Sequence, residues 1–291
     1  MAGHCSRHLA AVTLRSVFVI GAFQPSVAFI EISSSPFSAH RFRHARTAGT
    51  VVPHYNSQRC RPVREDLRTA TASMASDTGF KSSSFDWEGQ WSKGLGKGDM
   101  WDTGIVSPAL QDLLHTEVLP KGRAFVPGCG RGYEAIAFGR SGYDCIGLDL
   151  SPSGIEEAKS LLAEEKESMN GKVEFRAEDF FKFTAEEEGK FDVILDYTFL
   201  CAIDPSAREA WADRMVSLLE PAGELVTLIF PIVKKEGGPP FAMSEDIVSG
   251  LLEPRGLTPI RLEKLPQSLC HPSREGKTAL GRWRFASSSS A

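Results

Sequence analysis

A glycine-rich stretch that lies between an apolar run and a helical pattern constrains the fold of this chain most strongly. The five residues from Gly128 to Gly132 read G-C-G-R-G, after an apolar run over 123–126 and before a helical pattern over 133–140. Glycine lets the main chain approach a ligand closely, and the free N–H groups at a helix start face that ligand. A strand, a glycine turn and a helix in this order predict an α/β sheet that receives a nucleotide-like ligand at the turn.

The spacing of the glycines narrows the choice of ligand. A dinucleotide fingerprint needs a third glycine where this chain has Tyr133, and no Lys-Ser or Lys-Thr pair follows as a phosphate-binding P-loop requires. The spacing G-x-G-x-G is instead typical of methyltransferases that use S-adenosylmethionine (SAM). The alternative is a tight glycine turn that binds no ligand.

Size and charge exclude some classes of function. The 291 residues, 42% of them hydrophobic, are enough for one good-sized core. Residues 1–75 contain nine Arg, no Lys and three acids, whereas residues 76–291 carry 24 basic and 34 acidic side chains. An acidic domain without a basic stripe binds nucleic acid poorly, because phosphate contacts dominate that affinity. We therefore expect a small-molecule substrate and no nucleic-acid partner.

The cysteines give no sign of a metal site or a disulfide framework. The six cysteines stand at positions 5, 60, 129, 145, 201 and 270, and no two of them form a C-x-x-C pair. We expect reduced thiols inside a cell or organelle, and no metal.

Residues 1–75 have the composition of a targeting presequence, largely disordered, ahead of a methyltransferase domain over 76–291. Residues 1–28 resemble a signal peptide, with an apolar core over 16–23 and small residues at Ser26 and Ala28 before a possible cleavage site. Residues 29–75 are rich in Ser, Thr, Ala and Arg, as transit peptides are. The two parts resemble the plastid presequences of algae with complex plastids, so we expect a plastid protein. A mitochondrial presequence, a plain disordered extension and a cytosolic form that starts at Met74 are the alternatives. The apolar core is too short to span a membrane, so no stable membrane association is expected.

Three tryptophans precede the glycine stretch. Trp87 and Trp91 are four residues apart, hence on one helical face, and Trp101 follows a flexible loop over 92–98. Large aromatic side chains commonly anchor a covering helix to a core. Indole faces also attract cations such as a sulfonium, so the segment is interpreted as an anchor, an aromatic lid, or both.

Strand and helix patterns alternate after residue 123, which predicts a mostly parallel sheet with helices on both faces. We expect strands at 123–126, 144–149, 173–177, 191–199, 223–230, 258–265 and 282–286. We expect helices at 105–119, 133–140, 152–167, 206–219 and 244–252, the third capped by Ser151 and the fourth opened by a capping box from Ser206 to Glu209.

Two acidic residues end strands of this sheet. Asp149 lies 19 residues after Gly130, where a carboxylate can accept hydrogen bonds from both ribose hydroxyls of an adenosine. Asp179 follows the next strand and could accept from an adenine amino group, with an aromatic neighbour against the ring. The alternatives are a helix cap for Asp149 and a solvated turn for Asp179.

Several of these motifs together resemble one family. The motifs W-D-x-G at 101–104, V-P-G-C-G-x-G-Y at 126–133, G-L-D-x-S at 147–151, D-F-F at 179–181, D-Y-T-F-L-C-A-I at 196–203, F-P at 230–231 and G-G-P-P at 237–240 carry the likeness. Over roughly 84–284 the chain resembles the thiopurine/thiol methyltransferase family, and most of all the plant-type halide, thiocyanate and thiol methyltransferases.

The resemblance implies a class I SAM-dependent methyltransferase fold: Rossmann-like, α/β, with a mostly parallel seven-stranded sheet. It implies SAM as methyl donor. We also expect a monomer and no metal. The residues expected to bind the cofactor are Trp87, Trp91, Trp101, Gly128, Cys129, Gly130, Asp149, Asp179, Phe180 and Tyr197.

The expected reaction is methyl transfer to a small soft anion (halide, thiocyanate or hydrosulfide) or to a thiol by in-line displacement. An anion needs no base, and residues 76–291 contain only His115 and His271 and no evident nucleophile–His pair. Positioning and desolvation then drive the reaction. Tyr197 is the candidate catalytic residue, as a hydrogen-bond donor that positions the anion or as packing against SAM, whereas Cys201 is expected to be a small core residue. The alternatives are a thiopurine-like S-methyltransferase for aromatic or heterocyclic thiols and a SAM-binding protein or interaction module without catalysis.

Overall fold

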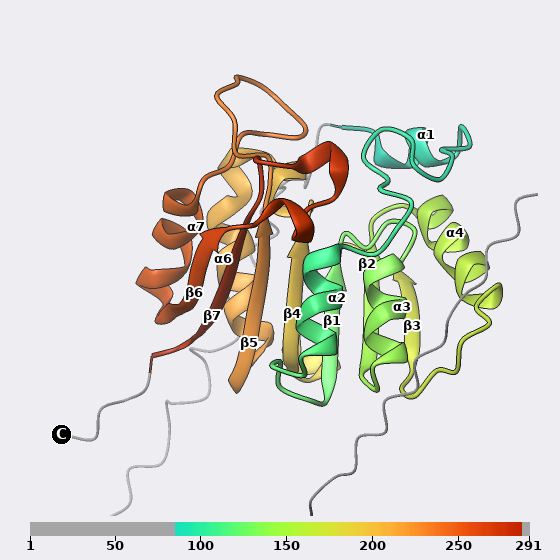
Figure 1. The fold of residues 1–291 in the computed structure, drawn as a ribbon, viewed down its shortest axis with the longest axis horizontal. Helices are drawn as coiled ribbons and strands as arrows, with labels where there is room; N and C mark the ends of the chain where they lie inside the picture. The colour runs from blue at the N-terminus through green and yellow to red at the C-terminus, as the bar shows by residue number, and fades with distance from the viewer. Residues whose placement is uncertain (1–84, 287–291) are drawn as a thin grey trace, which may run out of the picture. The chain divides into compact units, whose positions relative to one another are not determined.

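A seven-stranded sheet forms the centre of the protein in a computed structural model, which describes residues 85–286 (Figure 1). Its strands are β1 (Arg123–Pro127), β2 (Asp144–Asp149), β3 (Val173–Ala177), β4 (Phe191–Tyr197), β5 (Leu219–Ile229), β6 (Leu257–Lys264) and β7 (Ala279–Phe285). They lie in the order β3-β2-β1-β4-β5-β7-β6. Strands β1 to β5 pair in parallel, and β7 runs antiparallel to both β5 and β6. The prediction of a mostly parallel sheet is confirmed.

Helices cover both faces of the sheet. The α-helices are α1 (Trp87–Trp91), α2 (Pro108–His115), α3 (Tyr133–Arg140), α4 (Pro152–Ala163), α5 (Ala185–Glu188), α6 (Arg208–Leu218) and α7 (Glu245–Leu252). Side chains alternate between the faces: Val193 and Leu195 of β4 pack in the core formed with α2, α3 and α4, and Ile194 packs in the core formed with α6 and α7. Because both faces of β4 are covered, its central residues Val193, Ile194 and Leu195 are all apolar.

The ends of several helices and strands differ from the predicted ones. Helix α2 begins at Pro108, with Ser107 as its N-cap, and so is shorter than the predicted 105–119. Helix α4 begins as predicted, where Ser151 Oγ accepts from Gly154 N at 3.0 Å, but ends at Ala163. Strand β5 begins at Leu219 and β7 at Ala279, both earlier than predicted. Strand β4 ends at Tyr197, because Thr198 has a φ of 62° that breaks the extended conformation.

The predicted capping box at the start of α6 is wrong. Asp204 accepts a hydrogen bond from Ser206 N at 2.9 Å and opens a 3₁₀ turn over Pro205–Ala207. Helix α6 then begins at Arg208 without a side-chain cap. Asp204 takes the capping role two residues earlier than the Ser206 motif indicates.

Two chain segments meet the edge of the sheet where the parallel strands end. The segment 85–104, with α1, lies beyond the carboxyl ends of β1 and β2 (Figure 1). Because β7 is antiparallel to β5, β7 begins at this same edge, so the connection 265–278 between β6 and β7 is also placed there. In open α/β sheets, ligands bind at the carboxyl ends of the strands.

Candidate active site

A cavity of about 740 Å³ opens at this edge of the sheet. Its wall is built from the ends of β1, β2 and β4, from the segment 85–103 and from residues 271–274. The wall includes every predicted site residue: Trp87, Trp91, Trp101, Gly128, Cys129, Gly130, Asp149, Asp179, Phe180 and Tyr197. A volume of this size is within the range of cofactor and small-molecule sites.

The glycine turn is shaped by residues that need to be glycine. Gly128 has a φ of 61°, and a Cβ on it would lie 2.4 Å from the Phe199 ring. Gly130 has a φ of 51° and lies under the Trp91 ring. Positive φ values and close packing let main-chain groups line the cavity where a side chain would fill it.

Asp149 is fixed at the end of β2 beside this turn. Its Oδ2 accepts from Gly130 N at 2.9 Å and its Oδ1 accepts from Ser151 N at 2.9 Å. Burial raises the pKa of this carboxyl, whereas the main-chain donors of Ser151 and Gly130 oppose that rise. Asp149 therefore anchors the glycine turn, and the cavity also reaches it.

Asp179 and Phe180 form the side of the cavity beyond β3. Asp179 Oδ1 accepts from Phe181 N at 3.0 Å, and both residues line the cavity. Phe180 is 5% exposed and meets the Phe199 ring edge-on at 5.0 Å between centroids. A carboxylate beside aromatic rings suits an adenine amino group and its ring, as expected for this pair.

The tryptophan segment is both an anchor and an aromatic wall. Trp91 is 4% exposed, and its ring contacts the backbone positions of Gly130 and Gly154 so closely that a Cβ would lie 3.3 and 3.2 Å from it. Trp87 and Trp101 meet edge to face at 5.2 Å and line the cavity. Trp91 thus holds the segment down while Trp87 and Trp101 present indole surface, which can attract a sulfonium.

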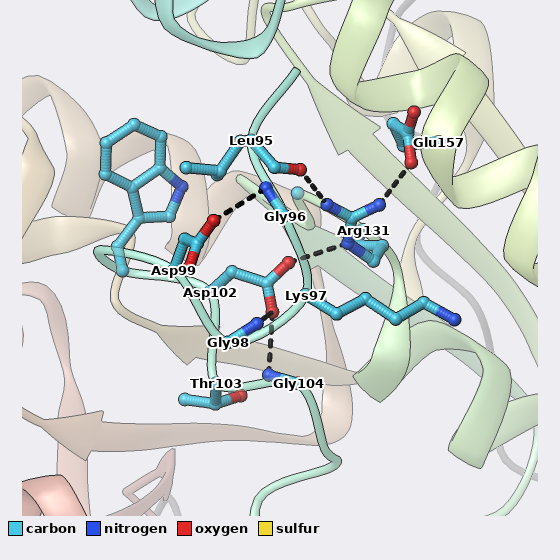
Figure 2. Close-up of polar contacts among 12 residues, drawn as sticks. Leu95, Gly96, Lys97, Gly98, Asp99, Asp102, Thr103, Gly104, Arg131 and Glu157 are labelled. Atoms are coloured by element: carbon cyan, nitrogen blue, oxygen red, sulfur yellow. Dashed lines mark hydrogen bonds and ion pairs between the residues drawn. The ribbon is translucent and has the colours of Figure 1, made fainter.

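Polar contacts tie this segment to the rest of the site. Glu88 of α1 accepts from Ser151 Oγ and Ser153 Oγ, each at 2.6 Å, at the start of α4. These hydrogen bonds lower the pKa of the Glu88 carboxyl. Arg131, which stands inside the glycine turn, donates through Nε to Asp102 Oδ2 at 2.7 Å (Figure 2).

Arg274 lies beside Tyr197 on the other side of the cavity. Its guanidinium carbon is 4.6 Å from the Tyr197 ring centroid and 4.7 Å from that of Phe230. The residue is 5% exposed, and its Nη2 donates to Trp101 O at 2.9 Å. Its Nη1 is buried and has no hydrogen-bond partner within residues 85–286. A buried cationic donor without a partner is costly unless a ligand supplies the acceptor.

Burial sets the protonation of the neighbouring groups. It raises the pKa of Tyr197 to about 12 and that of Cys201 to about 12, so both are protonated at neutral pH. Burial also raises the pKa of Glu134 to about 7, against a hydrogen bond from Ser107 N and the charge of Arg274. Tyr197 is therefore a neutral donor, and the buried thiol of Cys201 is a core group, as predicted, rather than a nucleophile.

The charge around the cavity suits a cationic ligand. Five acidic side chains line it: Asp102, Glu134, Asp149, Glu178 and Asp179. The arginines in the described wall are Arg131, which pairs with Asp102, and Arg274. SAM carries a sulfonium, which supplies an electrophilic methyl group, so the acidic side chains of the wall fit this cofactor.

Sequence reasoning missed Arg274, Glu134 and Arg131. Glu134 and Arg131 adjoin the glycine motif, and their proximity to it was the available signal. Arg274 stands in a turn-rich stretch with no motif of its own. Only the antiparallel direction of β7, which returns the 265–278 connection to the ligand edge, indicates its role.

Comparison with known proteins agrees with this geometry. Residues 83–282 match the model of the thiopurine S-methyltransferase (TPMT) family. The chain belongs to this family. A relative named probable thiol methyltransferase 2, from Arabidopsis thaliana, is 40% identical over 208 residues, which are 71% of this chain and 88% of that protein. Thiocyanate methyltransferase 1 from Brassica oleracea is 38% identical over 198 residues, 68% of this chain and 84% of that protein.

A solved structure agrees in fold. The N-methyltransferase NodS from Bradyrhizobium japonicum WM9, in complex with S-adenosylhomocysteine, aligns with a TM-score of 0.52 at 18% identity, over 68% of this chain and 97% of that one. The predictions of a class I methyltransferase fold and of a SAM-dependent methyltransferase are confirmed.

Within residues 85–286 no cluster of three or more His, Cys, Asp or Glu side chains could hold a metal ion. In the same part, no helix has the length and apolar content needed to cross a bilayer.

Proposed function

We propose that this methyltransferase transfers the methyl group of SAM to a small soft anion, such as a halide, thiocyanate or hydrosulfide, or to a thiolate. The observation that carries the proposal is Arg274, a buried guanidinium with an unpartnered Nη1 beside the Tyr197 ring. An anion at this point gains a charge-assisted hydrogen bond from a buried guanidinium. The thiol and thiocyanate methyltransferase names of the relatives support the same class of nucleophile.

The chain's own residues then have separate roles. Gly128, Gly130 and Asp149 are proposed to hold the amino-acid and ribose parts of SAM, and Trp87 and Trp101 to face the sulfonium. Asp179 and Phe180 are proposed to contact the adenine.

The nucleophile is held on the Arg274 side. Arg274 and the neutral Tyr197 hydroxyl donate to the anion, so that it attacks the methyl carbon in line with the bond to the leaving sulfur. No proton has to move when the nucleophile is already an anion. Orientation alone can supply about 7–11 kcal/mol of the rate enhancement.

A second function is methylation of aromatic or heterocyclic thiols, as the family name describes. The phenylalanine rings of Phe181, Phe199 and Phe230 in the cavity wall favour it, because they offer stacking surface for a larger ring. The alternative of a non-catalytic SAM-binding protein is set aside, because the chain belongs to a methyltransferase family.

One experiment separates these functions. The full chain is supplied with SAM and, separately, with iodide, thiocyanate, hydrosulfide and an aromatic thiol, and formation of S-adenosylhomocysteine is measured. Turnover with the small anions is expected. Turnover confined to the aromatic thiol would select the second function, and SAM binding without any turnover would contradict catalysis.

We also propose that residues 1–75 direct the protein to a plastid, although these residues lie outside the described part of the chain. A fusion of residues 1–75 to a fluorescent protein, expressed in a plastid-bearing cell, tests this directly. Accumulation in mitochondria would select a mitochondrial presequence, and accumulation in the cytosol would contradict organelle targeting by these residues.

We propose that the enzyme acts as a monomer, without nucleic acid and without stable membrane association. The net acidic charge of residues 76–291 supports the second point. Light scattering of the purified protein measures the mass, and a dimer would contradict the proposal.

A further inference from the structure

Arg131 joins three parts of the site that are far apart in sequence. The residue is 5% exposed although its side chain is charged. Its Nε donates to Asp102 Oδ2 at 2.7 Å, its Nη2 donates to Leu95 O at 2.5 Å, and its Nη1 pairs with Glu157 of α4 (Figure 2). The side chains of Arg131 and Asp102 are 4% and 1% exposed, so this is a buried ion pair and not a surface one.

Asp102 organises the loop that Arg131 holds. The Asp102 side chain is 1% exposed, and its Oδ1 accepts from Gly104 N at 2.7 Å and from Gly98 N at 3.4 Å. The loop from Leu95 to Gly104 therefore folds around this carboxylate, as Figure 2 shows. We call the contact between Arg131 and this loop, through Asp102 and Leu95, the clasp.

The clasp determines where the aromatic wall lies. Trp101 directly precedes Asp102, and its carbonyl oxygen accepts from Arg274 Nη2 at 2.9 Å. The ring of Trp91 lies 5.4 Å from the guanidinium carbon of Arg131. Releasing the clasp therefore frees the loop on which Trp101 stands and removes a cation from the Trp91 ring.

The position of Arg131 in the chain gives the clasp its functional meaning. Arg131 lies between Gly130 and Gly132, so its main chain belongs to the turn that lines the cofactor cavity while its side chain holds the wall opposite. Arg131 thus fixes the distance between the glycine turn and the loop that carries Trp101.

We propose that Arg131, with Asp102 as its partner, is a positioning residue that holds the tryptophan wall in place for SAM. The clasped loop is the state that binds the cofactor, and its population multiplies the intrinsic affinity. The proposal rests on the SAM site and is independent of which nucleophile is methylated.

The test uses the full chain and S-adenosylhomocysteine as the probe. Binding is measured by calorimetry for the wild type, for Arg131→Gln, and for the double variant Asp102→Asn/Arg131→Gln. The double variant removes both charges, so no unpaired buried carboxylate is left to unfold the protein. The matched control is Arg282→Gln, because Arg282 pairs with the fully buried Glu224 outside the cavity wall.

A second readout follows the wall itself. Trp87, Trp91 and Trp101 belong to the covering segment, whereas Trp211 and Trp283 are fully buried in the core. Quenching of tryptophan fluorescence by acrylamide therefore reports on the segment.

The proposal predicts that both clasp variants bind the probe about 10-fold more weakly or worse, the loss expected for one charge-assisted hydrogen bond. It also predicts greater quenching before the probe is added and a wild-type affinity for Arg282→Gln. Variant affinities within twofold of the wild type, with unchanged quenching, would overturn the clasp alone. A wild-type chain that fails to bind the probe would overturn the SAM site and the proposal with it.

Discussion

Replacing Arg274 by glutamine separates catalysis from stability in this site. The side chain is 5% exposed, and Nη1 has no partner among the described residues. A hydrogen bond that a charged group makes to a ligand contributes about 1.5–3 kcal/mol. Each 1.4 kcal/mol corresponds to about a tenfold change, so Arg274→Gln should lower kcat/KM for thiocyanate roughly 10- to 150-fold.

The same change should cost little stability. The arginine loses its contacts with the Tyr197 and Phe230 rings, each worth about 0.5–2 kcal/mol, but the buried Nη1 donor that lacks a partner is also removed. The two effects are of similar size, so we expect the melting temperature to change by less than about 5 °C.

Steady-state kinetics with thiocyanate and a thermal melt of the same preparation check both values. The binding constant for S-adenosylhomocysteine serves as a control for the lost bond to Trp101 O. Wild-type kcat/KM in Arg274→Gln would refute the role given to this residue. A large fall in melting temperature would show that the guanidinium has a structural role instead.

Three other variants test the cavity. Asp149→Ala should weaken SAM binding at least about 100-fold, because two charge-assisted hydrogen bonds to a ribose are lost, and unchanged affinity in calorimetry would contradict the ribose role. Gly128→Ala should lower the free energy of unfolding by about 2–5 kcal/mol, since the φ of Gly128 is 61° and an added Cβ would lie 2.4 Å from the Phe199 ring. Urea unfolding measures this free energy, and a decrease below about 1 kcal/mol would argue against the strain. Burial raises the pKa of Glu134 from 4.5 in the unfolded chain to about 7 in the folded protein. The free energy of unfolding of the wild type therefore falls by up to about 3 kcal/mol as pH rises from 4.5 through 7. Glu134→Gln should therefore gain melting temperature relative to the wild type between pH 5 and pH 8, and a difference that is independent of pH would be evidence against this ionisation.

The part of the cavity proposed to bind the cofactor could be predicted from the sequence because its signals are local. The glycine turn and the carboxylate of Asp149 each belong to a short motif at the end of one strand, and parallel strands bring such ends together. The Trp87–Trp91 pair is likewise within one helical turn, so its shared face follows from spacing alone.

The part of the cavity proposed to hold the nucleophile could not be predicted in the same way. Arg274 reaches Tyr197 only because β7 inserts antiparallel between β5 and β6, a choice of pairing that no local pattern encodes. The helix start near Ser206 shows the same limit at short range. Asp204 accepts hydrogen bonds from Ser206 N and Ser206 Oγ, so the serine hydroxyl bonds to Asp204 rather than capping the helix.

The most direct test of the account is to follow the methyl group itself. The full chain is incubated with SAM that carries a deuterated methyl group and with thiocyanate or iodide, and the headspace is analysed by mass spectrometry. We predict deuterated methyl thiocyanate or methyl iodide in amounts equal to the S-adenosylhomocysteine formed. S-adenosylhomocysteine binding with no deuterated product from either anion would contradict an anion site at Arg274.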